Sequence, residues 1–440
     1  MRAVTTLLFA LLLSFSAFAQ FEFGAEISAV FGSDFTLAEV AGTADGGDGD
    51  GIYFGSLTLR PAMGYSLGEV GSLALTLDVN TALVDGIDPN VALFEGYGAV
   101  NLPIVGELSM GIFDYACGDG GRYNAELNGI NTEAYIYGAA PLGLRLGNDF
   151  DGLSYDLIVG SGYGEEDNDS LMTGLTLGYS AGDFSASLYA VADSHAYDVR
   201  KLFYDSVVSR SPGVTVNKAP TSAWGYRDSQ FTDLPGTNHD LLQTLALGLN
   251  LDGAFSEAMS YHLTVAYHAY ADIDPNASAG QETGGSHLFL YPEVGVSIDW
   301  FDGYVAGMID NWSSSDNDGL NLFSPYDGAD PISTNLAYEV YAEAGVRLTD
   351  DFKVAVGCGY TEPSVQGEDL TGTTADDSMD VSFFVTPRLI WSPDTELGKA
   401  TFVLGSHYRQ WLVELYDDPA SADVNESQEI SIWFKMGVSL

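Results

Sequence analysis

The most restrictive feature of this chain is a period-two alternation of apolar with polar or small residues, which recurs from residue 21 to the end. In segment 21–29 the odd positions hold Phe, Ala or Ile, and the even positions hold Glu, Gly or Ser. In segments 336–348 and 430–440 every even position is apolar. Because successive side chains of a β-strand point to opposite faces, this period predicts strands with one apolar face.

The connections between these segments alternate in length. We expect short connections at 66–72, 102–106, 147–152, 181–183, 252–259, 299–303, 349–351 and 392–399. We expect long connections at 32–51, 82–90, 117–134, 164–169, 194–240, 272–285, 313–335, 362–380 and 412–427. Together they join about eighteen strands of about ten residues each, which is the pattern of outer-membrane barrels. Sixteen strands is the alternative count, because segments 91–101 and 304–312 are the weakest strand assignments.

The N-terminus has the pattern of a secretory signal peptide. Arg2 supplies the positive charge, residues 7–15 form a short apolar run, and Ala17-Phe18-Ala19 precedes Gln20. We expect cleavage after Ala19, because the apolar run is too short to span a bilayer comfortably. An exported chain whose apolar surface lies on strands can cross hydrocarbon only as a closed barrel, in which every backbone N–H and C=O is paired. The sequence therefore predicts a signal peptide over 1–19 and a single barrel domain over 20–440.

Composition excludes several other classes of protein. The 15 Lys and Arg residues stand against 62 Asp and Glu residues, and the resulting net charge of −47 repels the phosphates of nucleic acids. Only two cysteines, Cys117 and Cys358, are present, so a disulfide scaffold is excluded, and the 25 Tyr and 23 Phe residues argue against disorder. A secreted soluble β-protein is the remaining alternative, but its core would exceed what a single soluble domain builds.

The predicted fold is therefore all-β, a closed antiparallel transmembrane β-barrel with short periplasmic turns and long extracellular loops. Its long loops include 32–51, 117–134, 194–240, 313–335, 362–380 and 412–427. Pro61, Pro141, Pro292 and Pro387 fall inside the assigned strands. Because proline lacks the N–H that a β-ladder needs, we expect bulges or strand ends beside these four residues.

The signal peptide, the alternating strands, the short and long connections and the amphipathic final strand together resemble the Gram-negative outer-membrane porins. The resemblance covers the whole mature chain and is architectural, without a family-specific motif. It implies an outer-membrane location, contact with membrane lipid, passive diffusion of ions and small hydrophilic solutes through a water-filled channel, and a homotrimer. A barrel of about sixteen to eighteen strands is wide enough for such a channel.

When the less apolar face of each strand is placed toward the lumen, charged residues gather there. The predicted basic wall of the pore comprises Arg60, Arg347, Lys353, Arg388, Arg409 and Lys435. The predicted acidic lining comprises Glu22, Glu26, Asp78, Glu95, Asp156, Glu293, Glu339 and Glu343. The resemblance to porins implies that loop 117–134 folds inward, so that Asp119, Arg122, Glu126 and Glu133 form a constriction. Charges that line a pore select among ions, although a polar lumen face tolerates charge without using it.

Other features leave alternatives open. The acidic stretches that begin at Asp45, Glu165 and Asp316 predict solvated loops, with Ca²⁺ binding as the alternative, since none has the full spacing of a calcium loop. These loops also support an alternative function, a surface-exposed binding or adhesin barrel. Loop 194–240, which carries five Lys and Arg residues, is a second segment able to enter the pore. The sequence holds no HExxH or Walker-type motif, so we expect neither an enzyme nor a cofactor or metal site.

Overall fold

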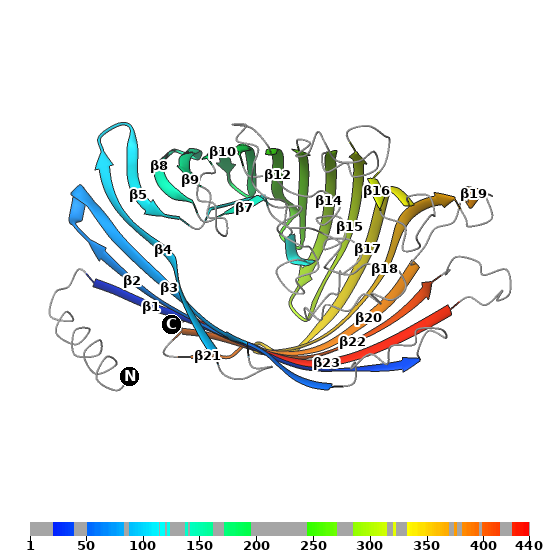
Figure 1. The fold of residues 1–440 in the computed structure, drawn as a ribbon. Helices are drawn as coiled ribbons and strands as arrows, with labels where there is room; N and C mark the ends of the chain where they lie inside the picture. The colour runs from blue at the N-terminus through cyan, green and yellow to red at the C-terminus, as the bar shows by residue number, and fades with distance from the viewer. Residues whose placement is uncertain are drawn as a thin grey trace.

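The computed structural model describes most of the chain beyond residue 20 and shows a barrel of β-strands (Figure 1). The described residues are 21–38, 51–82, 88–113, 115–118, 121–123, 137–139, 141–161, 171–194, 244–270, 285–314, 320–322, 332–368, 374–375, 381–395, 398–413 and 425–439. The predicted signal peptide and nearly all of loop 194–240 lie outside these residues.

Eighteen antiparallel strands form the barrel wall, and each pairs with the next wall strand along the chain. They are β1 (Phe21–Ala38), β2 (Gly51–Ser66), β3 (Gly71–Ala82), β4 (Asp88–Leu102), β5 (Gly106–Ile112), β8 (Leu142–Phe150), β9 (Leu153–Ser161), β10 (Leu171–Ala181), β11 (Phe184–Asp193), β12 (Thr244–Ser256), β13 (Met259–Tyr270), β14 (Gly285–Ile298), β15 (Phe301–Ser314), β17 (Ile332–Thr349), β18 (Phe352–Glu368), β20 (Val381–Trp391), β22 (Gly398–Val413) and β23 (Asn425–Ser439). The predicted antiparallel barrel of eighteen strands is confirmed.

The barrel closes through its first and last strands. β1 pairs with β2 on one side and with β23 on the other, from Glu26 opposite Ser439 to Ala38 opposite Gln428. In Figure 1 the blue β1 lies beside the red β23. Closure leaves no wall strand with an unpaired edge, which is the condition for placing β-structure in hydrocarbon.

The remaining described elements belong to the connections. β6 (Tyr115–Cys117) and β7 (Tyr137–Ala139) form a separate two-stranded sheet between β5 and β8. β16 (Leu320–Leu322), β19 (Thr374–Ala375) and β21 (Asp394–Thr395) pair with β17, β18 and β22, and the 3₁₀ turn η1 (Gly68–Val70) joins β2 to β3. Within the described residues, no helix is both long enough and apolar enough to cross a membrane.

Several strands are longer than the alternation predicts. β1 continues to Ala38, β18 continues to Glu368, and β23 begins at Asn425, so the loops predicted at 32–51, 362–380 and 412–427 are shorter. The physical reason is that strand pairing continues beyond the hydrocarbon, where the outer face no longer has to be apolar. The two weakest predicted strands, 91–101 and 304–312, are present as β4 and β15.

The two faces of the barrel have the polarity of a membrane protein. The outer face exposes large apolar side chains, among them Leu73, Met110, Leu144, Leu177, Leu188, Val305, Val340, Leu389, Leu404 and Ile432. The inner face buries polar and charged side chains, among them Thr264, His287, Glu293, Asp310, Glu339 and Arg388. Aromatic pairs flank several short turns, including Phe255 with Tyr261 and Trp391 with Phe402. This arrangement suits hydrocarbon outside with aromatic residues at its boundary.

The prolines interrupt the ladder without shifting its register. Beside Pro61, Pro292 and Pro387, pairing with the following strand lapses for two residues and then resumes in the same register. The expected bulges therefore do not form, because the loss of one N–H donor is accommodated by a local gap in pairing. Pro141 directly precedes β8, so it does mark a strand end.

Candidate channel lumen

The connection between β5 and β8, residues 113–141, is called the inner loop below, and its described residues 113, 115–117 and 121–123 pack inside the barrel. Phe113, Tyr115 and Cys117 are buried in one cluster with Ile158, Met172, Tyr189, Val191 and Ala246 of the wall. The Tyr115 hydroxyl lies 3.5 Å from Thr176 Oγ1 of β10, and Cys117 Sγ lies 3.7 Å from the same atom. The start of the inner loop thus packs against the lumen face of β9–β12.

A few residues further, the inner loop reaches β14 and β15. The backbone N–H of Arg122 donates to Glu293 Oε2 at 2.9 Å, and its guanidinium donates to Asp302 Oδ1. The same guanidinium lies 4.5 Å from the centre of the Tyr304 ring, within the range of a cation–π contact. Arg122, predicted at the constriction, therefore binds the wall through both its backbone and its side chain.

Tyr123 contacts β17 beside Arg122. Its hydroxyl donates to Glu339 Oε1, and its ring stacks on Tyr341 with ring centres 4.5 Å apart. Glu339 also accepts a 3.0 Å hydrogen bond from Thr361 of β18. Sequence reasoning missed Tyr123, because an aromatic residue in a polar loop gives no sign of its distant partner.

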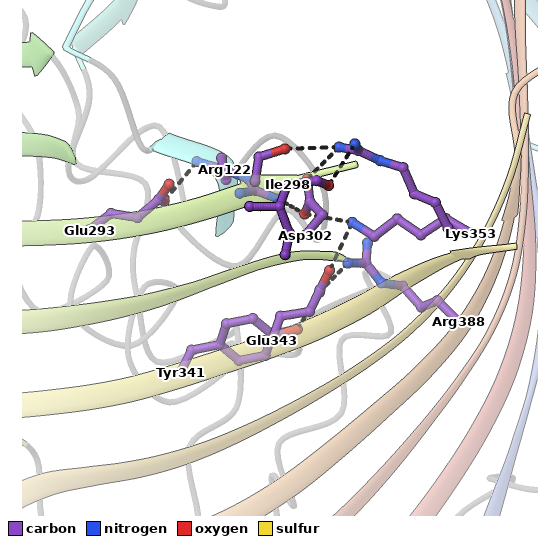
Figure 2. Close-up of polar contacts among 10 residues, drawn as sticks. Arg122, Glu293, Ile298, Asp302, Tyr341, Glu343, Lys353 and Arg388 are labelled. Atoms are coloured by element: carbon purple, nitrogen blue, oxygen red, sulfur yellow. Dashed lines mark hydrogen bonds and ion pairs between the residues drawn. The ribbon is translucent and has the colours of Figure 1, made fainter. Parts of the chain in front are cut away.

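Asp302, near the start of β15, binds three cations at once (Figure 2). Besides Arg122, it accepts hydrogen bonds from Arg347 at 3.1 Å and from Lys353 at 3.0 Å. Asp302 fell inside the turn predicted at 299–303 and was not expected to face the lumen. The strands bring it beside Lys353 and Arg347, which face each other across β17 and β18.

Glu343 forms a second ion-paired centre next to Asp302. Arg388 of β20 donates to Glu343 Oε2, and Lys353 Nζ lies 3.5 Å from Oε1. The Arg388 side chain is 2% exposed and that of Glu343 is 0% exposed, so this pair is enclosed by protein. The predicted basic wall is therefore corrected at this position: Arg388 faces the lumen interior, but its charge is paired with a buried acid instead of being presented to water.

The other predicted charges lie on the strands that meet at closure. Arg60 of β2 forms an ion pair with Asp78 of β3 at 3.5 Å, and Glu26 of β1 lies directly opposite Arg60. Lys435 of β23 interacts electrostatically with Glu26 and with Arg388. Glu26 attracts Lys435 and Arg388 repels it, so charges of both signs lie where the first and last strands meet.

An arginine that the sequence reasoning missed faces this side of the lumen. Arg145 of β8 forms an ion pair with Asp156 of β9 at 2.9 Å, and its side chain is 38% exposed. The signal was present in the sequence, because Arg145 alternates with Leu144 and Leu146. Glu107 of β5 was missed in the same way and accepts a hydrogen bond from Ser109 at 3.2 Å.

Exposure differs between the two sides of the lumen. We call the lumen-facing residues of β1–β5, β8 and β9 the N-terminal wall, and those of β12–β15, β17, β18 and β20 the C-terminal wall. The C-terminal wall, which the inner loop contacts through Arg122 and Tyr123, is mostly buried. On the N-terminal wall most described side chains are partly accessible, and Glu22 and Glu26 are exposed. The accessible space inside the barrel therefore lies along the N-terminal wall.

Several predicted residues fall outside the described part of the chain. They are Asp119, Glu126 and Glu133 of the inner loop, the acidic stretches at 45–50, 165–169 and 316–318, and the side chain of Arg409. The backbone of Arg409 pairs with Phe384 and Glu429. The constriction and the Ca²⁺ alternative at these positions stay predictions.

The lumen also contains buried histidines. His287 Nε2 lies 2.7 Å from Asp310 Oδ1, and His262 Nδ1 lies 2.6 Å from Asp252 Oδ1. Each ring is thereby oriented by a carboxylate of the neighbouring strand. Within the described ranges, no group of three or more His, Cys, Asp or Glu residues is placed to hold a metal ion.

A closed barrel of eighteen strands, apolar outside and charged inside, has the architecture of an outer-membrane porin. Similar solved structures include Pseudomonas aeruginosa OpdL, with a TM-score of 0.55 and 9% identity over 96% of this chain and 99% of OpdL. Pseudomonas aeruginosa OccD3 (OpdP) has a TM-score of 0.52 and 8% identity over 96% of this chain and 91% of that chain. Pseudomonas aeruginosa OprD has a TM-score of 0.50 and 10% identity over 96% and 95%. No protein-family model and no curated protein matches the chain.

Proposed function

We propose that this protein is an outer-membrane channel through which ions and small hydrophilic solutes diffuse passively. The observation that carries the proposal is the difference in exposure between the two walls. Residues 121–123 of the inner loop lie on the C-terminal wall, whereas polar and charged side chains of the N-terminal wall keep access to solvent. A barrel of this strand number has room for an aqueous path beside such a loop.

The charges along this path favour cations. Among the described side chains, the N-terminal wall holds seven carboxylates, those of Glu22, Glu26, Asp78, Glu95, Glu107, Asp149 and Asp156. It holds two guanidinium groups, those of Arg60 and Arg145. An acidic lining raises the local concentration of cations and lowers that of anions. The basic residues of the C-terminal wall oppose this field weakly, because Asp302 and Glu343 neutralise them locally.

Planar-bilayer recording tests both parts of the proposal. Purified, folded protein is expected to give discrete conductance steps, and a KCl gradient is expected to give a reversal potential of the sign for cation preference. Folded protein is recognised by an electrophoretic mobility that changes when the sample is heated. If such protein gives no conductance step, the channel is rejected. Steps accompanied by anion preference would retain the channel and reject the acidic path. The homotrimer implied by the resemblance stays a prediction. The mass of the protein within its detergent complex tests it.

A further inference from the structure

Three consecutive residues of the inner loop, Gly121, Arg122 and Tyr123, contact the C-terminal wall, and the wall is shaped to receive them. Their partners lie on β13, β14, β15 and β17, more than one hundred residues further along the chain. Each of the three makes a different kind of contact. The match is therefore more specific than a polar loop resting on a polar surface.

Gly121 fits because it has no side chain. Its φ is +59°, in the left-handed region that favours glycine. A Cβ at this position would lie 2.7 Å from Glu293 Oε2, 2.8 Å from the Tyr291 ring and 3.1 Å from the His262 ring. The backbone at 121 thus approaches the wall as closely as the chain permits, and this brings the next N–H to Glu293.

Arg122 binds a site on β15 whose residues are held in place by contacts among the wall strands. Arg347 and Lys353 hold Asp302 in place through contacts within the wall. Tyr304 supplies a ring face for the guanidinium, and Gly295 leaves space beside it, since a Cβ there would lie 3.3 Å from Arg122 Nη1. Contacts that do not involve the inner loop therefore fix the Asp302 carboxylate, which reduces the entropy lost when Arg122 binds.

Tyr123 adds a contact that does not depend on charge. Its ring stacks on Tyr341, and its side chain is among the most completely buried in the described residues, at 1% exposed. Its hydroxyl completes the hydrogen bonding of Glu339 together with Thr361. Burial of an aromatic ring supplies more binding energy than a screened ion pair in a wet lumen.

We propose that Gly121-Arg122-Tyr123 is a docking element that positions the inner loop on the C-terminal wall and so sets the cross-section of the open path. The three residues act by position, through the loop that they hold. The inference rests on the proposed channel function. Loss of docking frees the loop to leave the C-terminal wall and enter the open path, so the path becomes narrower on average and fluctuates more.

Two chemically different variants test the docking element. Gly121→Ala disrupts the close approach without changing charge, and Arg122→Gln removes the contact to Asp302. Each is expected to lower the single-channel conductance roughly 1.5-fold or more and to increase open-channel noise, because conductance follows the bore of the path. Gly437→Ala on β23 is the matched control, since a Cβ at this position would meet nothing within 4 Å.

A reversible tether separates loop position from other effects. Thr176→Cys places a second thiol opposite Cys117, whose Sγ lies 3.7 Å from Thr176 Oγ1. In the Arg122→Gln background, oxidation by diamide is expected to return conductance and noise toward wild type, and a reducing thiol is expected to reverse this. Cys117→Ser in the same background removes the bond and should remove the response.

The outcomes separate this inference from the proposed function. Wild-type protein without conductance rejects the channel itself. A conducting wild type whose Gly121→Ala and Arg122→Gln variants keep its conductance and noise rejects the docking element. The inference also fails if Gly437→Ala reproduces the changes, or if the tether forms and alters nothing. For every variant, a change in electrophoretic mobility on heating establishes that the barrel has folded.

Discussion

The indole ring of Trp433 lies over Gly405, its direct cross-strand partner on β22. Trp433 is 1% exposed, and a Cβ at position 405 would fall inside the ring's van der Waals radius. Tyr189 covers Gly248 and Phe384 covers Gly359 in the same manner. On the inner face, glycines thus provide flat surfaces on which large rings lie.

Gly405→Ala is therefore expected to destabilise the barrel by about 2 kcal/mol, because the new methyl group displaces the Trp433 ring. Gly437→Ala on β23 is the matched control, since its Cβ would meet nothing within 4 Å. The measurement is the denaturant midpoint of unfolding in lipid vesicles. Equal midpoints for the two variants would contradict the prediction.

The buried pair of Arg388 with Glu343 predicts an effect on stability. Arg388→Met leaves an acid that is 0% exposed, with Lys353 and the neutral Tyr341 hydroxyl as its remaining contacts among the described residues, and we expect a loss of roughly 3 kcal/mol. Adding Glu343→Gln should recover much of this loss, because the uncompensated charge is removed. Unfolding midpoints of both single variants and of the double variant form the test. If the double variant is less stable than Arg388→Met, the uncompensated charge of Glu343 is not the cause of the lost stability.

The pair of Arg145 and Asp156 predicts a change in ion selectivity. Arg145→Gln removes positive charge from the accessible path and should raise the cation-to-anion permeability ratio. Asp156→Asn removes negative charge from the same pair and should lower the ratio. Reversal potentials in a KCl gradient provide the measurement. Shifts of the same sign in both variants would rule out a field effect of this pair.

The two cysteines should differ in reactivity. Cys117 is 3% exposed in the inner loop, and burial raises the pKa of its thiol. Since the thiolate is the reactive form, alkylation of Cys117 should be slow at pH 8 and accelerate at higher pH. Cys358 is exposed between its cross-strand partners Ala342 and Val385 on the outer face, so a membrane-soluble maleimide should label it faster than a charged one. Cys117→Ser and Cys358→Ser variants assign each signal, and rapid labelling of Cys117 at pH 8 would refute its enclosure.

Alternation alone predicted the barrel because hydrocarbon imposes a local rule on every strand. Residues such as Asp78, Glu339 and Lys353 were assigned to the inner face by their position relative to apolar neighbours. Arg145 obeyed the same rule and was overlooked. Asp302 was assigned to a turn, because polar residues at a strand end look the same as those of the turn itself.

The contacts of the inner loop could not be predicted in this way. Arg122 and Glu293 are 171 residues apart, and no periodicity relates a loop to a strand at such a distance. The pairing of Arg388 with Glu343 is similarly non-local, because a strand lies between their own strands and no sequence spacing records it. Alternation predicts which charges face inward. Only the packing shows which of them neutralise one another.

Closure between β1 and β23 has a consequence for how the barrel forms. On this side the hydrogen-bonding partner of β1 is the wall strand that lies furthest from it in sequence. Until residues 425–439 pair with both neighbours, β1 and β22 each have a long row of N–H and C=O groups without a permanent partner. A chain truncated before β23 should therefore be unable to close, and its two open edges should pair with other chains.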